Sequence, residues 1–73
     1  MEFAEFFREL RGQRSQEDFA ELLGLTQAHV SRIESGMRPS IKVITALIRQ
    51  FPEQQERVFF LLQKYANNHE CMQ

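Results

Sequence analysis

The sequence contains little cysteine, glycine or proline and no long apolar run, and each of these absences excludes a class of protein. Its single cysteine, Cys71, excludes a disulfide within the chain and a zinc site built from cysteines. No run of about 18 apolar residues occurs, so no segment is expected to span a membrane. Three glycines and two prolines are too few for the many turns of an all-β domain. These absences favour one small helical domain, because 73 residues lie near the lower limit for a single core without cross-links.

Residues that would support catalysis or cofactor binding are also missing. The sequence has no glycine-rich phosphate loop, no nucleophile paired with a base and no cluster of metal ligands. His29 has no second ligand three or four residues away. We therefore expect no enzyme activity, no metal, no cofactor and no small-molecule substrate. The first ten residues are acidic and amphipathic, unlike a signal peptide, so we expect a cytoplasmic protein.

Charge is distributed unevenly along the chain. The net charge of −1 lacks the basic excess that is typical of a nucleic-acid-binding protein. Residues 1–26 carry a balance of −3, whereas residues 27–49 carry +3, from Arg32, Arg38, Lys42 and Arg49 against Glu34. Phosphate affinity depends on the charge of the surface that is presented. The low total charge therefore predicts that a single copy would bind any nucleic acid weakly.

Apolar spacing and capping residues predict five helices in one domain of residues 1–66, followed by a flexible tail of residues 67–73. Three of the helices are preceded by good N-cap residues, Ser15, Thr26 and Ser40. Pro52 is expected to open the fifth helix, because proline is tolerated in a first turn. The predicted helices cover about residues 2–11, 16–23, 27–35, 41–51 and 52–66.

The block from Gln16 to Ser35 predicts two short helices joined by a tight turn. Ala20 is small where two crossing helices touch, and Gly24 occupies the position at which the first helix must end. Glycine is favoured there because it enters the left-handed backbone region without a Cβ penalty. The second helix leaves a polar face that can contact nucleic acid, made of Gln27, Ala28, His29, Ser31 and Arg32.

This block resembles the phage-repressor and Cro-type helix-turn-helix family. The pattern is Ser-Gln-x-x-Phe-Ala-x-x-x-Gly-Leu-Thr-Gln, followed by Val-Ser-x-Ile-Glu-x-Gly. The resemblance covers about residues 6–51. It implies an all-α fold, a compact lambda-repressor-like bundle of about five helices, which binds double-stranded operator DNA, usually as a homodimer. It also implies that the third helix enters the major groove while the second lies across the backbone.

Two departures from the family pattern affect the first helix. Arg14 occupies a position that is usually apolar, and the link between the first two helices is about two residues shorter than usual. The first helix is therefore expected to pack in a shifted register. In the family an arginine on this helix pairs with the glutamate that corresponds to Glu34. Either Arg11 or Arg8 takes that position here, and we favour Arg11.

The resemblance and the chemistry of the side chains together predict DNA contacts. Gln27 matches the N6 and N7 atoms of adenine, Ala28 offers a methyl group to thymine, and Arg32 can bind guanine or a phosphate. Gln16 is expected to hold a phosphate at a helix N-terminus. The alternative for the loop residues is that their charges are merely solvated. The complete set of predicted backbone contacts is Gln16, His29, Ser31, Arg38, Ser40 and Lys42.

The fifth helix has more apolar residues than one core-facing stripe requires, which indicates self-association. The alternative is that the helix is buried between the first and fourth helices, where Phe3 and Phe7 also need to be covered. The predicted dimerisation surface consists of Leu47, Phe51, Phe59, Phe60 and Leu62.

The sequence thus predicts a DNA-binding transcriptional regulator that acts as a homodimer on a palindromic operator. A restriction–modification controller, a phage repressor and an antitoxin all remain compatible with it. The alternative function is a protein-interaction module, such as an antitoxin that binds a partner protein through the fifth helix.

Overall fold

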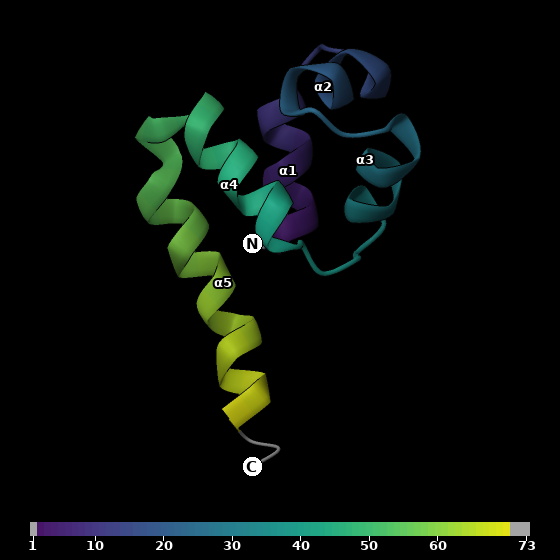
Figure 1. Ribbon diagram of the computed structural model, residues 1–73. Helices are drawn as coiled ribbons and strands as arrows, with labels where there is room; N and C mark the ends of the chain where they lie inside the picture. The colour runs from purple at the N-terminus through teal and green to yellow at the C-terminus, as the bar shows by residue number, and fades with distance from the viewer. Residues whose placement is uncertain (1, 71–73) are drawn as a thin grey trace.

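A computed structural model describes the backbone of residues 2–70 and the side chains of residues 2–63. In Figure 1 helices α1 to α4 gather into a globule, and α5 leaves it so that its C-terminal half projects away from the other elements. The elements are α1 (Phe3–Arg11), α2 (Gln16–Leu23), α3 (Gln27–Glu34), α4 (Ile41–Gln50), the 3₁₀ helix η1 (Pro52–Gln54) and α5 (Gln55–Glu70). The prediction of an all-α fold with five helices is confirmed.

Hydroxyl side chains begin α2, α3 and α4, as the sequence indicates. Each accepts a hydrogen bond from a backbone N–H in the first turn, which satisfies one donor that has no partner within the helix. The donor–acceptor pairs are Asp18 N to Ser15 Oγ at 3.0 Å, His29 N to Thr26 Oγ1 at 3.1 Å, and Val43 N to Ser40 Oγ at 3.4 Å. These caps determine the residues at which α2, α3 and α4 begin.

The turn between α2 and α3 depends on Gly24, whose φ of 72° and ψ of 32° are left-handed. Directly after it, the Leu25 N–H donates to the Ala20 carbonyl at 2.8 Å and closes the end of α2. A Cβ at Gly24 would meet no heavy atom within 4 Å. The need for glycine therefore comes from backbone conformation and not from crowding.

The core is built around phenylalanines from α1 and α2. The rings of Phe7 and Phe19 meet edge to face with centroids 5.1 Å apart, and Phe51 lies 6.2 Å from Phe19. Aromatic pairs at these separations are favourable beyond the area they bury. The buried apolar residues are Phe3, Phe6, Phe7, Phe19, Ala20, Leu23, Val30, Ile33, Val43, Leu47, Val58 and Leu61.

Helix α5 differs from the prediction at both ends. The prolyl turn forms a 3₁₀ helix at Pro52–Gln54, and α5 proper starts at Gln55 and continues to Glu70, beyond the expected end at Ala66. Residues 67–70 contain no glycine or proline, so no residue forces the helix to stop. The last three residues of the predicted tail lie outside the described residues. No helix in the described part of the chain is long and apolar enough to cross a membrane.

One residue of the predicted dimerisation surface, Leu47, belongs to the core, which corrects that part of the prediction. Leu47 is fully buried on the inner face of α4, so it has no surface for a partner. Phe51 is only partly exposed, because its ring packs against Phe19. The spacing of apolar residues along α4 and α5 does not distinguish a helix face that packs inward from one that packs on a second copy.

Candidate nucleic-acid interface

Helix α3 presents one continuous exposed face opposite the core. Val30, Ile33 and Glu34 are buried, and at about 100° per residue their directions centre on the side opposite Ala28 and Arg32. Ala28 and Arg32 are both exposed and are four residues apart, so they lie one turn from each other in the middle of this face.

Three further side chains of α3 lie to either side of Ala28 and Arg32. Gln27 is exposed on one side together with Ser31, which is half-buried, and His29 is half-buried at the opposite border. These five side chains span about 200° of the helix circumference, with Ala28, Ser31 and Arg32 between Gln27 at one edge and His29 at the other. Such a face fits the major groove, which admits an α-helix.

The N-termini of α2 and α3 are joined by a hydrogen bond between two glutamines. The Gln27 Nε2 atom donates to the Gln16 Oε1 atom at 2.6 Å, and both residues occupy the first position of their helices. The first N–H groups of a helix have no acceptor within it, and its positive dipole end favours a phosphate. The pair thus places a candidate base-reading side chain beside a candidate phosphate-binding terminus.

Glu34, at the C-terminal end of α3, is a buried carboxylate with several donors. Arg11 Nε donates to Glu34 Oε2 at 2.6 Å and Arg11 Nη2 to Glu34 Oε1 at 3.1 Å, which forms a bidentate ion pair. The hydrogen bond to Glu34 raises the pKa of the Arg11 guanidinium above its ordinary value. Arg8 also reaches this residue, through a 2.6 Å bond to the Glu34 carbonyl. The preference for Arg11 as the partner is confirmed, and both arginines connect α1 to α3.

The loop from Gly36 to Ser40 is fixed at both ends. The Gly36 N–H donates to the Ile33 carbonyl and the Met37 N–H to the Arg32 carbonyl, both at 3.0 Å, while Pro39 is buried. Arg38, between these anchors, is exposed next to the end of α3.

Beyond the loop, Ser40 and Lys42 are exposed at the start of α4. Lys42 adds a cation to the N–H donors of that helix end. The loop and the first turn of α4 thus present two cations on an anchored backbone, which is suited to phosphate contacts.

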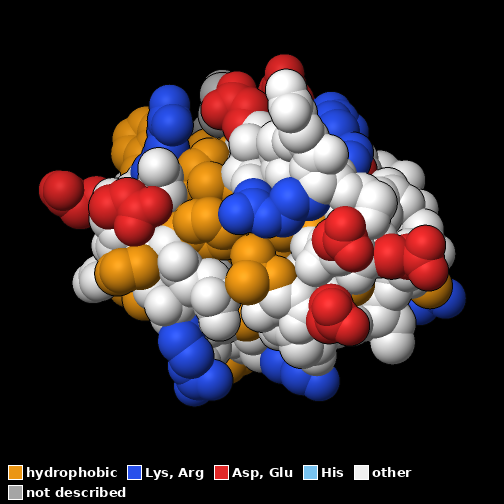
Figure 2. Space-filling view, turned by 90° about the horizontal axis from the view of Figure 1, so that it is seen from above, with side chains coloured by type: hydrophobic (Ala, Val, Ile, Leu, Met, Phe, Trp, Pro, Cys, Tyr) orange, Lys and Arg blue, Asp and Glu red, His pale blue; other side chains and the backbone are white. Residues whose placement is uncertain are grey.

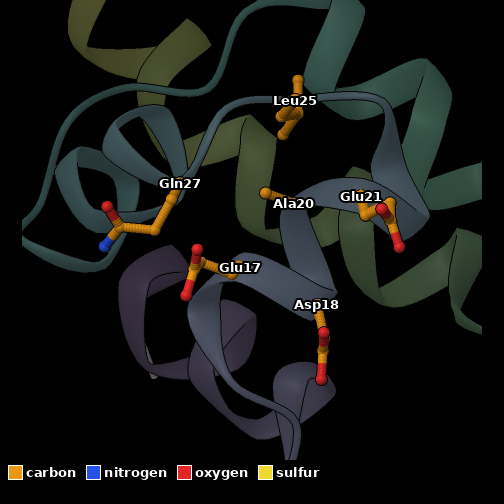
Figure 3. A pocket seen from close by; sticks show the side chains of 6 residues that line it. All are labelled: Glu17, Asp18, Ala20, Glu21, Leu25 and Gln27. Atoms are coloured by element: carbon orange, nitrogen blue, oxygen red, sulfur yellow. The ribbon is translucent and has the colours of Figure 1, made fainter.

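An acidic edge borders this interface on α2. Figure 2 looks down on the end of the molecule that carries α2 in Figure 1, and acidic side chains gather at one side of this view. Glu17, Asp18 and Glu21 line a shallow hollow that Gln27 and Leu25 complete. In Figure 3 the Glu17 and Gln27 side chains extend toward the same space. A carboxylate in this position repels a phosphate that approaches Gln27, so the interface carries both signs of charge.

Sequence reasoning missed three of these relationships, the first being the hydrogen bond from Gln27 to Gln16. It did not foresee that Glu17 lies beside Gln27, nor that Gln16 donates to Glu34, a bond of 3.1 Å. A usable signal was present, because both glutamines occupy helix starts that the Gly24 turn folds back on each other.

Comparison with known proteins supports the helix-turn-helix assignment. The model of a helix-turn-helix family matches residues 7–53, which is more than half of the chain and runs from α1 into η1. No curated protein and no solved structure gives a match. The matched segment contains α2, the Gly24 turn, α3 and the flanking loop, and such a domain implies DNA binding; the family is typically non-enzymatic. The chain belongs to the Cro/C1-type helix-turn-helix family.

Proposed function

We propose that this protein is a cytoplasmic transcriptional regulator that binds a palindromic operator as a homodimer. Helix α3 of each copy enters the major groove, where Gln27, Ala28 and Arg32 contact base edges. The sugar–phosphate backbone is held by Gln16, His29, Ser31, Arg38, Ser40 and Lys42. The chemistry is recognition alone, and the regulator acts through occupancy of its operator.

The observation that carries this proposal is the exposed face of α3. Ala28 and Arg32 lie at its centre with Gln27 beside them, and the core holds the opposite side of the helix rigidly. Arg38 is exposed in the anchored loop that follows α3, and Lys42 is exposed in the first turn of α4. In protein–DNA interfaces, contacts to base edges determine sequence specificity, and contacts from cations to phosphates position the protein. The side chains of α3 are suited to the first role, and Arg38 and Lys42 are suited to the second.

The exposed phenylalanines of α5 support the homodimer. Val58 and Leu61 bury one side of α5, whereas Phe59 and Phe60 are 47% and 65% exposed. Phe60 lies about 200° around the helix from Val58, so it faces away from the core. Leu62 is half-buried at the edge of the packed face. Two exposed phenylalanines in sequence form an apolar surface that a second copy would cover.

Dimerisation would also compensate for the low charge of the monomer. Two copies double the number of phosphate contacts and place two α3 helices on half-sites about one helical turn apart.

Selection of bound duplexes from a random DNA pool at low salt tests the proposal. We expect enrichment of a site with two-fold symmetry whose half-sites are separated by about 10 base pairs. Enrichment of a single asymmetric half-site would remove the homodimer from the proposal. Failure to enrich any sequence would contradict specific recognition.

A protein partner is the second candidate function, and the same exposed phenylalanines favour it. In that case α5 binds another protein, such as a toxin, and the chain remains a monomer on its own. Light scattering at tens of micromolar separates the two candidates, because the homodimer predicts twice the mass of the chain.

A further inference from the structure

A continuous chain of hydrogen bonds connects the two ends of α3 through α2. Glu34 accepts from Gln16 Nε2 at 3.1 Å, and Gln16 Oε1 accepts from Gln27 Nε2 at 2.6 Å. Glu34 itself is 8% exposed and is held by two bonds from Arg11. The buried carboxylate is thus two hydrogen bonds away from the candidate base-reading amide.

The charge of Glu34 determines the direction of this chain. An ionised carboxylate only accepts hydrogen bonds, so Gln16 must turn its NH₂ group toward it. The carbonyl oxygen of Gln16 then points to Gln27. Because this oxygen can only accept, Gln27 must donate to it from its own NH₂ group. A neutral amide at position 34 would accept either orientation of Gln16, and the direction of the chain would no longer be determined.

This direction matters because a glutamine amide has two chemically different ends. With one N–H given to Gln16, Gln27 retains one N–H donor and its carbonyl acceptor. Adenine presents one acceptor, N7, and one donor, the N6 amino group, in the major groove. The remaining groups of Gln27 match this pair, and the bond to Gln16 holds the amide in place before DNA arrives.

We propose that Glu34 is a positioning residue that sets the base preference of Gln27 through Gln16, without contacting DNA. The inference rests on the proposed function, in that Gln27 reads a base. It goes further by assigning specificity to a buried carboxylate that otherwise serves only to join α1 to α3. Loss of the Glu34 charge should therefore weaken discrimination at one base pair, in addition to any effect on stability.

The test compares E34Q with R11K on duplexes that carry each base pair at the position read by Gln27. In the parent protein we expect adenine to be preferred by roughly tenfold or more. In E34Q we expect this ratio to fall to about two- or threefold. R11K weakens the same ion pair but leaves the carboxylate as an acceptor for Gln16, so its ratio should stay at the parent value although its stability falls.

Two further variants keep the result interpretable. Q16L breaks the chain while leaving the Arg11–Glu34 pair intact, so it should relax the ratio even if E34Q fails to fold. In a Q27A background, E34Q should have no further effect on the ratio. A ratio that stays at the parent value in Q16L, and in a folded E34Q, would overturn the inference, as would equal relaxation in R11K. If Q27A itself leaves every ratio unchanged, the base-reading role of Gln27 fails instead.

The free protein offers a readout that does not depend on DNA. The side-chain NH₂ protons of Gln27 should give NMR chemical shifts displaced from those of a solvated glutamine, because one of the two protons is held by Gln16. In E34Q and Q16L these signals should move toward those of a solvated glutamine, whereas in R11K they should not. Unchanged Gln27 signals in a folded E34Q would contradict the hydrogen-bond chain.

Discussion

The guanidinium of Arg11 and the carboxylate of Glu34 form a bidentate pair, with bonds of 2.6 and 3.1 Å, that joins α1 to the end of α3. The pair is largely buried, with side-chain exposures of 24% and 7%. The pair also contacts the candidate nucleic-acid interface, because Glu34 accepts a further hydrogen bond from Gln16. The orientation of α3 in this fold therefore depends on α1.

Replacement of Arg11 by methionine should destabilise the domain by about 3 kcal/mol, because it leaves a buried carboxylate without its cation. Urea unfolding followed by circular dichroism measures this change. R14M is the matched control: Arg14 is exposed and bonds only a backbone carbonyl of α1, so its loss should cost well under about 1 kcal/mol. Equal losses in the two variants would show that the ion pair contributes little.

Substitution of Gly24 should separate backbone conformation from crowding. Valine strongly disfavours the left-handed region, whereas asparagine tolerates it, and neither meets nearby atoms through its Cβ. G24V should lower the free energy of unfolding by about 2 kcal/mol, and G24N by about half as much. Thermal unfolding of both variants checks the order; a G24N variant as unstable as G24V would require a steric cause.

Leu47 and Phe60 should behave in opposite ways when they are truncated. L47A leaves a cavity in the core and should cost about 2–5 kcal/mol in monomer stability. F60S removes an exposed ring, so the stability of the monomer should change by less than about 0.5 kcal/mol.

In the proposed homodimer, however, F60S removes a buried ring from each copy. Two rings at about 1.5–3 kcal/mol each correspond to an increase of roughly 100-fold or more in the dimer dissociation constant. Analytical ultracentrifugation measures this constant. An unchanged constant in F60S would place any dimer interface elsewhere on the molecule.

Neutralising the acidic edge should strengthen DNA binding without changing its sequence preference. E17Q removes a carboxylate beside Gln27, and we expect affinity to rise about two- to fivefold on every duplex at low salt. E53Q, on η1, has the same charge change outside α2 and α3 and should have a smaller effect. A gain that persists undiminished at high salt would not be electrostatic.

The sequence predicted the local structure well where one residue decides it. Ser15, Thr26 and Ser40 cap three helices, and Gly24 ends α2, because each supplies a group or a conformation that few other residues offer. It did not predict that Leu47 lies wholly inside the core. That outcome depends on how α4 packs against α2 and α5, which apolar spacing along the chain does not encode.

The polar chain through Gln16 was missed for a similar reason. Gln16 and Gln27 are eleven residues apart, and only the folded turn brings their amides within 2.6 Å. Glutamine is compatible with solvent at both positions, so composition alone did not indicate a contact. The pairing of Arg11 with Glu34 was predicted because the family resemblance supplied it.

Comparison of Q27A with R38A decides whether α3 reads DNA sequence while the flanking loop holds the DNA backbone. Affinities would be measured by fluorescence anisotropy on the selected operator and on the duplexes that differ from it at single base pairs. Q27A should lose discrimination of about 1–3 kcal/mol at one position in each half-site and retain it elsewhere. R38A should weaken binding to every duplex by a similar factor and reduce the salt dependence of affinity. Uniform losses in both variants, with no position relaxed by Q27A, would show that Gln27 on α3 does not read the DNA sequence.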